Sequence, residues 1–327
     1  MPSSLISAEN LTVEYAVGSR VIQAASDVTL KIAPGEIVGI VGESGSGKST
    51  LCAALIRALP PYTRISGKVD FAGQDLYALS SSELRALRRR DIAMVPQNPM
   101  TSLDPLFTIG NQMDEVISTR ISASQDRRLS AVDLLRRVHM TAPEMRIGQY
   151  PHELSGGMKQ RVLIAIATAS SPKLILADEP TSALDATIQE EILVLFDEIR
   201  EKTGCAVVIV SHDLGAIKRV CDRTIIMYAG RIVEDGRTGD VFSNPRHPYT
   251  RALLGSLPRI VDDHVVISSI GGQVPDLSKL GAGCAFAERC PDAMDICRVQ
   301  RPPAVSVAPS HSAACWAIGP ALQEAAQ

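Results

Sequence analysis

A glycine-rich segment has the residue types and spacing to bind nucleotide phosphates. Residues 42–49 fit the pattern G-x-x-x-x-G-K-[ST], after an apolar run at 37–41 and before a helix-favouring stretch that begins at Lys48. In that context glycines let backbone N–H groups converge on phosphate oxygens, while the lysine neutralises phosphate charge and the serine can ligate Mg²⁺. The predicted nucleotide contacts are Gly42, Ser44, Gly45, Ser46, Gly47, Lys48, Ser49 and Thr50.

Two carboxylates at the end of another apolar run could supply hydrolytic chemistry. Residues 173–179 indicate a strand that ends in Asp178 and Glu179. Successive strand residues point to opposite faces, so the two acids should have different roles. Asp178 is expected to hold Mg²⁺, and Glu179 to polarise the water that attacks the γ-phosphate. A strand ending in acids is common, and this one gains meaning from the glycine loop upstream.

A third segment, residues 154–160 (LSGGMKQ), opens a predicted helix with Ser155, Gly156 and Gly157 and has no strand before it. The exposed N–H groups and dipole of such a helix start can bind a second phosphate. Taken alone, a serine followed by glycines would be only a helix cap. Beside the first two motifs, it predicts a second phosphate-binding element in the same chain.

The elements that must position these motifs are apolar strands alternating with helices, which predict an α/β P-loop NTPase core with a parallel sheet covered on both faces. The strand runs are 37–41, 174–177, 206–210 and 224–228. Between about 98 and 164 helical periodicity replaces them, which predicts an inserted helical subdomain. Prolines accumulate beyond about 243. We therefore expect an ATPase domain at 1–244 and a small, loop-rich C-terminal region at 245–327.

Composition excludes several classes of protein. The chain has 33 Lys and Arg against 36 Asp and Glu, a net charge of −3, which argues against a nonspecific nucleic-acid binder. No apolar run reaches the roughly 18 to 20 residues that span a bilayer, and the N-terminal residues do not resemble a leader. Seven cysteines, an odd number, fit reduced thiols in a cytoplasm better than a disulfide scaffold.

Together, these motifs resemble the ATP-binding cassette (ABC) ATPases over nearly the whole chain. Gln97 after a strand, the turn at 182–185 (SALD) and His212 after another strand match further family motifs. The resemblance implies that Gln97 ligates Mg²⁺ and senses nucleotide, and that His212 contacts the γ-phosphate. It also implies that Tyr15 stacks on adenine. The implied catalytic residues are Glu179, His212 and Gln97, and the implied Mg²⁺ ligands are Ser49, Gln97 and Asp178.

The family resemblance also implies a head-to-tail dimer of two ATPase domains. In such a dimer the helix start at 155–157 caps the ATP that is held on the partner's glycine loop. The second ATPase would be an identical chain or a paralogue. Met158 and Lys159 depart from the LSGGQ-type pattern, without an expected effect on phosphate contact.

A closer resemblance is to the ATPase subunits of dipeptide and oligopeptide importers, through residues 98–103, 150–154 and 247–250 and the cysteine-bearing tail. It implies a peripheral subunit on the cytoplasmic face of the cell membrane that hydrolyses ATP to energise a peptide importer. Its implied partners are two transmembrane permease subunits and an extracytoplasmic substrate-binding protein, and no nucleic acid. The alternatives are an ATPase of a nickel or other small-solute importer, or a soluble ABC switch ATPase outside transport.

Four cysteines in the tail could ligate a metal centre. They are spaced C-x5-C-x6-C-x17-C, at Cys284, Cys290, Cys297 and Cys315. Zinc usually takes shorter C-x2-C to C-x4-C spacings, and a cysteine–proline step such as the one at Pro291 recurs at iron–sulfur sites. The resemblance points the same way, so we expect a [4Fe-4S] cluster of structural or regulatory role. Zinc is the alternative, and four buried thiols without metal are the simplest explanation.

Overall fold

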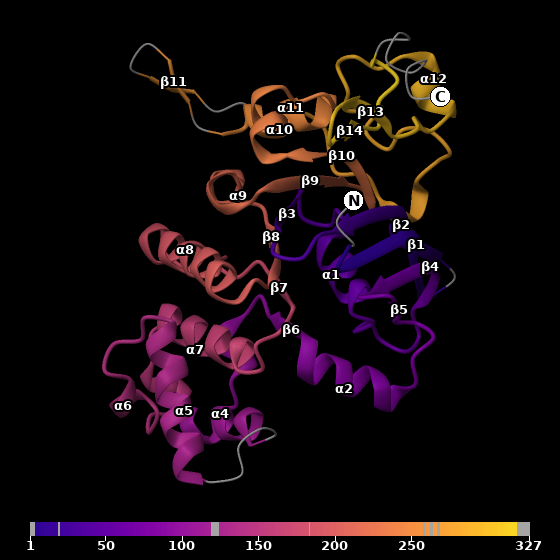
Figure 1. Cartoon of the computed structure of the whole chain (residues 1–327). Coiled ribbons are helices and arrows are strands. Elements are labelled where there is room, and N and C mark those ends of the chain that lie inside the picture. The colour runs from indigo at the N-terminus through magenta and orange to yellow at the C-terminus, as the bar shows by residue number, and fades with distance from the viewer. Residues whose placement is uncertain are drawn as a thin grey trace. The chain divides into compact units, whose positions relative to one another are not determined.

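The computed structural model describes residues 4–18, 20–118, 124–182, 184–257, 259–261, 264–266 and 269–318, with backbone alone at 124–129, 259–261 and 264–266. The chain divides into two compact units. Unit 1 combines Met1–Ala78 with Val210–Gln327, and unit 2 is Leu79–Ile209. Figure 1 labels the elements of both units, which are described separately below.

Unit 1 begins with a four-stranded antiparallel sheet of order β2-β1-β4-β5. Its strands are β1 (Ile6–Val17), β2 (Arg20–Ile32), β4 (Arg64–Phe71) and β5 (Gln74–Asp75). In β2, Val28, Leu30 and Ile32 are buried while the residues between them are exposed. This alternation is typical of a sheet with one buried face. These strands contain no continuous apolar run of the kind found in the buried strands, so the apolar runs of the sequence did not predict this sheet.

The second sheet of unit 1 contains the strand that precedes the glycine loop. In it β3 (Ile37–Val41) pairs in parallel with β9 (Arg223–Tyr228), and β10 (Arg231–Arg237) pairs antiparallel with β9. All of β3 and nearly all of β9 are buried, which explains why both read as unbroken apolar runs. The helices of this part are α1 (Lys48–Leu55), α9 (Leu214–Val220), α10 (Thr238–Ser243) and α11 (Pro248–Gly255).

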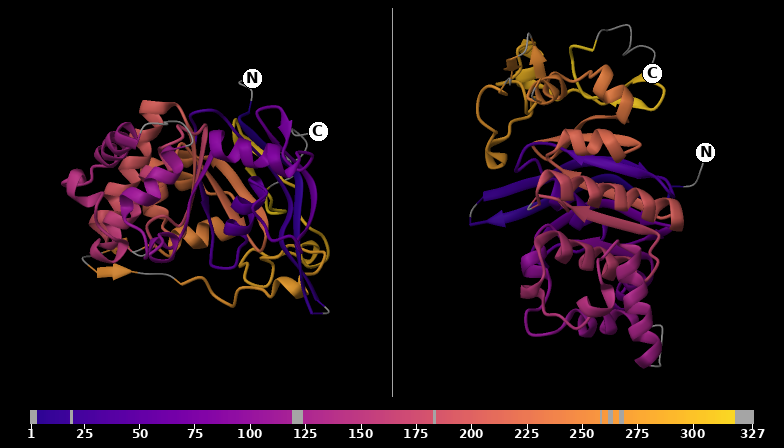
Figure 2. Two further views of the ribbon diagram at one scale, coloured as in Figure 1. Left: turned by 90° about the horizontal axis from the view of Figure 1, so that it is seen from below. Right: turned by 90° about the vertical axis from the view of Figure 1, so that its left-hand side faces the viewer.

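The C-terminal segment packs into unit 1. It contains β11 (Arg259–Val261), β12 (His264–Val266), η2 (Leu277–Lys279), α12 (Asp295–Val299), β13 (Val305–Ala308) and β14 (His311–Ala313). We predicted a small, loop-rich region here; within it β14 pairs with β10 and β13 pairs with β14, so the tail also extends the core sheet. Strands of three and four residues are too short to detect by periodicity. In Figure 1 the yellow part of this segment, with α12, β13 and β14, lies beside the orange helices α10 and α11, and Figure 2 shows the same segment from two further sides.

Unit 2 contains a parallel strand pair and a group of helices. Its strands β6 (Ile92–Val95) and β7 (Leu174–Asp178) are parallel neighbours. The helices are α2 (Ser81–Asp91), α3 (Pro99–Ser102), α4 (Ile109–Ile117), α5 (Ser124–Arg137), α6 (Pro143–Arg146), η1 (Pro151–Glu153), α7 (Gly156–Thr168) and α8 (Ala186–Thr203). Between 98 and 164 the described residues form helices and turns but no strand. The last strand here, β8 (Ala206–Ser211), contains the junction with unit 1.

A buried histidine in unit 1, His247, should make the stability of the protein depend on pH. His247 is 1% exposed, and its Nδ1 accepts the Tyr249 N–H (3.0 Å) at the start of α11. Its own N–H donates to Glu234 (2.8 Å). Burial, with a contribution from the Arg251 charge, lowers the pKa of His247 to about 3. The unfolded chain therefore binds the proton more readily, so this residue's contribution to stability falls as the pH drops below about 6.5.

When the pH is lowered from 7.5 to 5.5, His247 should reduce the free energy of unfolding by about 1.4 kcal/mol. The matched variant is His247→Asn, because an asparagine oxygen can still cap α11 but does not titrate. Urea unfolding at both pH values should show a smaller loss of free energy of unfolding in the variant than in the wild type. Equal losses in the two proteins would contradict the assigned pKa.

Candidate nucleotide-binding site

The glycine loop joins β3 to α1, and two of its glycines are required by space. A Cβ at Gly42 would lie 2.2 Å from the Met227 carbonyl oxygen, and one at Gly47 would lie 2.0 Å from that of Ala24. Gly47 also has a φ of +96°, in the left-handed region that favours glycine. The loop therefore passes close to neighbouring backbone and leads directly into the N-terminus of α1.

Lys48 lies inside this loop. Its side chain is buried, and Nζ donates to the carbonyl oxygens of Gly42 (2.8 Å) and Glu43 (3.0 Å) and to Ser46 Oγ (3.4 Å). A positive charge is thus held beside backbone N–H groups and the helix N-terminus, which is a favourable setting for a polyphosphate. Ser44, Gly45 and Ser49 are exposed, and Thr50 is half-buried.

The two other residues predicted for nucleotide contact in unit 1 lie on different elements. Tyr15 is half-buried in β1, opposite Ile22 of β2. His212 follows β8 and is exposed, and the next residue, Asp213, caps α9 by accepting the Gly215 N–H (2.8 Å). The turn therefore places His212 between a buried strand and a capped helix, where its ring is accessible.

Unit 2 brings together two predicted catalytic residues. Gln97 follows β6 and Glu179 follows the neighbouring β7, and Gln97 Nε2 donates to Glu179 Oε2 (2.8 Å). Glu179 has a φ of +44°, which is uncommon for a residue with a side chain and typical of functional turns. Asp178 is buried at the end of β7. The two acids therefore differ in surroundings, as their alternation along the strand predicts.

The segment at 155–157 opens α7, and Ser155 Oγ caps it by accepting the Met158 N–H (3.4 Å). A Cβ at Gly157 would lie 2.6 Å from Ile188 Cγ2 of α8, so packing within unit 2 favours glycine there. At Gly156 a Cβ would meet Leu184 at 3.5 Å, an ordinary contact. Of the predicted turn at 182–185, Ala183 lies outside the described residues, and Asp185 caps α8.

The four tail cysteines are free thiols in one part of unit 1. The Cys284 N–H donates to the Cys297 carbonyl (2.7 Å). Burial raises the pKa values of Cys284, Cys290 and Cys315, and the charges of neighbouring cysteines raise them further. Within the described part of the chain, however, no group of three or more His, Cys, Asp or Glu side chains is arranged to hold a metal ion. The structure thus does not display the predicted iron–sulfur or zinc centre.

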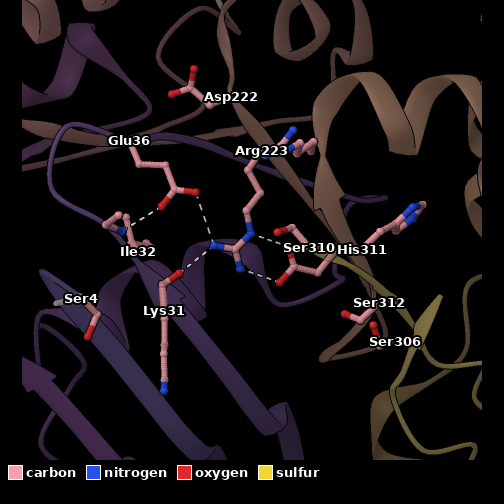
Figure 3. Close-up of a pocket in the computed structure, with 13 residues that line it drawn as sticks. Ser4, Lys31, Ile32, Glu36, Asp222, Arg223, Ser306, Ser310, His311 and Ser312 are labelled. Atoms are coloured by element: carbon pink, nitrogen blue, oxygen red, sulfur yellow. Dashed lines mark hydrogen bonds and ion pairs between the residues drawn. The ribbon is translucent and has the colours of Figure 1, made fainter. Parts of the chain in front are cut away.

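A cavity of about 750 Å³ in unit 1 lies away from the predicted motifs (Figure 3). Arg223 in its wall donates to both carboxylate oxygens of Asp235 (2.6 Å each) and to the Lys31 carbonyl (2.7 Å), and lies 3.4 Å from Glu36. Its charge is therefore compensated by the protein itself. Sequence spacing gave no signal for this network, which joins strands of both sheets of unit 1.

Comparisons with known proteins define the class of this chain. A family model described as "ABC transporter" matches residues 25–182, and one described as "Oligopeptide/dipeptide transporter, C-terminal region" matches 233–297. A solved dimeric ATP-binding cassette, in a post-hydrolysis state bound to ADP and Pi, is 32% identical with a TM-score of 0.64 over 71% of this chain and 98% of that one. The chain belongs to the ATP-binding cassette family.

Similar chains within the family include ATP-binding proteins of peptide transporters. One, from Sinorhizobium fredii and named "Probable peptide ABC transporter ATP-binding protein", is 44% identical over 95% of this chain and 94% of that protein. The dipeptide transport ATP-binding protein of Bacillus subtilis is 41% identical over the same shares. The predicted fold and the predicted class of enzyme, an ABC-type ATPase, are confirmed. No helix in the described ranges has the length and apolarity to cross a membrane.

Proposed function

We propose that this chain is the ATP-hydrolysing subunit that energises an importer of dipeptides or oligopeptides through ATP-driven dimer closure. The main support is similarity to peptide transporter ATP-binding proteins along 95% of the chain. That similarity includes the C-terminal region, whose family model is described by oligopeptide and dipeptide transport. This combination favours peptide import over nickel or other small-solute import and over a soluble switch ATPase.

In this proposal each motif has a separate role in hydrolysis. Lys48 balances the charge of the β- and γ-phosphates, and Ser49, Gln97 and Asp178 bind the Mg²⁺ that accompanies ATP. Glu179 accepts a proton from water as the water oxygen bonds to the γ-phosphorus and the bond to ADP breaks, which gives ADP and phosphate. The Gln97 hydrogen bond orients the Glu179 carboxylate. His212 contacts the γ-phosphate and Tyr15 stacks on adenine.

The second ATPase subunit, identical or paralogous, is proposed to receive Ser155, Gly156 and Gly157 on its bound ATP. The packing of Gly157 against Ile188 makes Gly156 the better test, because only Gly156 has room for a side chain within its own subunit. Gly156→Leu should leave the monomer's ATP affinity within about twofold and block ATP-induced dimer formation, lowering the ATPase rate about tenfold or more.

The matched control for this prediction is Gly148→Leu, at an exposed position of the same unit where a Cβ would make only an ordinary contact, 3.7 Å from the Met145 carbonyl oxygen. Its ATP-induced dimer, detected by size-exclusion chromatography, should equal that of the wild type. If Gly156→Leu lost ATP binding as a monomer, or dimerised normally, the proposed contact in trans would be wrong.

Exposed apolar side chains in unit 2 support a docking site for permease segments. Leu106 and Met100 are 80% and 61% exposed, and Phe107, Met145 and Tyr150 are also exposed. All five lie between residues 100 and 150, within the predicted helical insert, and exposed apolar side chains of this kind can bind another protein. We infer that cytoplasmic segments of two transmembrane permeases cover them, which would place the subunit on the cytoplasmic face of the membrane. A substrate-binding protein completes the importer outside.

The experiment for this function is affinity purification of the tagged chain from detergent-solubilised membranes of its native cells. Two permeases and a second ATPase should copurify, and Leu106→Ser with Phe107→Ser should lose the permeases but retain ATP binding. Val17→Ser with Val21→Ser, which changes exposed apolar residues of unit 1, is the control. Copurification with ribosomes or nucleic acid, or permeases retained by the unit 2 variant, would overturn the proposal.

We also propose that Cys284, Cys290, Cys297 and Cys315 bind a [4Fe-4S] cluster. These thiols lie close enough to influence one another: Cys297 and Cys315 contribute to the raised pKa of Cys284, and Cys315 and Cys284 contribute to that of Cys290. Zinc usually takes C-x2-C to C-x4-C spacings, whereas the shortest gap between these cysteines is five residues, so zinc is the alternative. In a [4Fe-4S] cluster each cysteine would bind a different iron.

A buried arginine adds support for an anionic group at these cysteines. Arg231 Nε and Nη1 are buried without a hydrogen-bond partner, and Arg231 and Cys284 line the same cavity of about 340 Å³. Burial, together with the Arg301 charge, lowers the pKa of Arg231 to about 10, and the Asp27 charge and, to a smaller extent, a negative charge on Cys284 oppose that shift. Thiolates that bind a cluster would supply this charge. When bound, the cluster would hold the tail together and take no part in hydrolysis.

Anaerobic purification tests this proposal by colour and metal content. The protein should be brown and contain about four irons and four sulfides per chain. Colourless protein with one zinc per chain would contradict the cluster and support the zinc alternative. Metal-free protein with a normally folded tail would show that the four cysteines are simply buried thiols.

A further inference from the structure

The glycine loop is joined to the cysteine-bearing tail by a two-point ion pair. Arg289 Nη1 lies 2.7 Å from Glu43 Oε2, and Nη2 donates to Glu43 Oε1 (3.0 Å). The Arg289 side chain is only 4% exposed and that of Glu43 is 23% exposed. Such bidentate pairs away from solvent are directional and strong compared with surface ion pairs. The pair connects residues 246 positions apart within unit 1.

Arg289 is fixed from its other side as well. Its Nε donates to the Gly271 carbonyl (2.8 Å), Nη1 donates to the Tyr228 hydroxyl (3.2 Å), and the guanidinium lies over the Tyr228 and Phe286 rings. The hydrogen bonds to Glu43 are the main reason that the pKa of Arg289 is raised despite burial. With both ends of the guanidinium held, the tail presents a rigid positive charge to Glu43.

The backbone around Glu43 is held by the same region. The Glu43 N–H donates to the Tyr249 hydroxyl (2.9 Å), and Tyr249 packs against Tyr228 and Phe286, with ring centroids 4.6 and 5.4 Å away. The Glu43 carbonyl accepts one of the bonds from Lys48 (3.0 Å). A continuous set of contacts therefore runs from Arg289, through Glu43, to the lysine expected at the phosphates.

We propose that Arg289 is a positioning residue for nucleotide binding, through which the state of the cysteine-bearing tail sets the affinity of the loop for ATP. Two physical effects support this role. Arg289 neutralises a carboxylate inside an anion-binding loop, and it fixes the backbone from which Lys48 is held. Cys290 follows Arg289 directly, so a change at that cysteine acts on the backbone that carries the guanidinium. The proposal rests on the proposed nucleotide site but not on the solute transported.

Isothermal titration of the isolated chain with MgATP, MgADP and AMP tests the proposal. Arg289→Met leaves Glu43 as an unpaired negative charge, so the Kd for MgATP should rise about tenfold or more. The rise should be smaller for MgADP and smallest for AMP, because repulsion grows with phosphate charge. A loss of folding alone would not produce this order. Arg289→Lys keeps the charge without the two-point geometry and should give an intermediate Kd.

Two further variants separate the effect of the Glu43 charge from the effect of a change at Cys290 in the tail. Adding Glu43→Gln to Arg289→Met should restore part of the affinity, because the unpaired charge is removed. Cys290→Ser should raise the Kd in the wild type but have little further effect in Arg289→Met, since both act through one contact. Arg251→Met, which breaks an exposed pair with Asp292 in the same region, is the control and should leave the Kd within about twofold.

The outcomes distinguish this inference from the proposed function. If Arg289→Met and Arg289→Lys both bind MgATP within about twofold of the wild type, Arg289 has no positioning role. The inference also fails if Cys290→Ser raises the Kd equally in the wild type and in Arg289→Met, because the two would then act independently. If instead Lys48→Ala binds ATP normally, the nucleotide site itself is misassigned.

Discussion

Glu179→Gln will lower the steady-state ATPase rate about 100-fold or more, while the Kd for MgATP stays within about twofold of the wild type. The amide keeps the size of the side chain but cannot accept the proton of the attacking water. Its partner Gln97 can still form a hydrogen bond to the amide oxygen. ATP should therefore remain bound, and the variant should accumulate a closed, ATP-containing dimer. Phosphate release and size-exclusion chromatography measure the two effects.

The control for this prediction is Glu201→Gln, at an exposed acid near the end of α8. Its ATPase rate should match the wild type. Near-normal turnover of Glu179→Gln, measured together with its proper partner subunits, would show that another group activates the water. Loss of ATP binding in this variant would instead mean that Glu179 contributes to the nucleotide site and not to the chemical step.

Lys48→Ala should raise the Kd for MgATP about 100-fold or more. The substitution removes the cation expected beside the β- and γ-phosphates, and it also leaves the Gly42 and Glu43 carbonyls without the donor that now joins them. Both effects weaken binding itself, in contrast to the loss at Glu179. Isothermal titration measures the change, and binding equal to that of the wild type would contradict the assigned role.

Lys68→Ala, on the exposed part of β4, controls for the loss of one positive charge in the same unit. Its Kd should be unchanged, because exposed charges at a distance are screened by salt. Thermal unfolding of Lys48→Ala should accompany the titration. A variant that keeps its unfolding midpoint while losing ATP affinity separates the role of Lys48 in binding from its role in holding the loop.

The buried strands of the core could be predicted from the sequence because a strand covered on both faces must be apolar at every position. Residues 37–41 form β3 as predicted, and the run at 174–177 corresponds to β7, which also includes Asp178. The start of α1 at Lys48 follows from the glycine loop before it. The N-terminal sheet was not predicted, since its one buried face leaves an alternating pattern in place of a continuous apolar run.

The contacts of the site could not be predicted in the same way. Glu43 and Arg289 are far apart in the chain, and neither spacing nor periodicity indicates that such residues will pair. The constraint at Gly157 depends on Ile188 of another helix, and the hydrogen bond between Gln97 and Glu179 depends on the register of β6 with β7. Local patterns identify residues that can do chemistry, whereas their partners are set by the tertiary fold.

The central claim is that ATP hydrolysis by this chain drives peptide uptake, and transport in proteoliposomes tests it most directly. The complex purified through this chain is reconstituted with ATP inside, and labelled dipeptides or oligopeptides are supplied outside with the substrate-binding protein. We predict peptide accumulation that requires internal MgATP and that Glu179→Gln abolishes. A complex that hydrolyses ATP and accumulates nickel or another small solute, but no peptide, would contradict the claim.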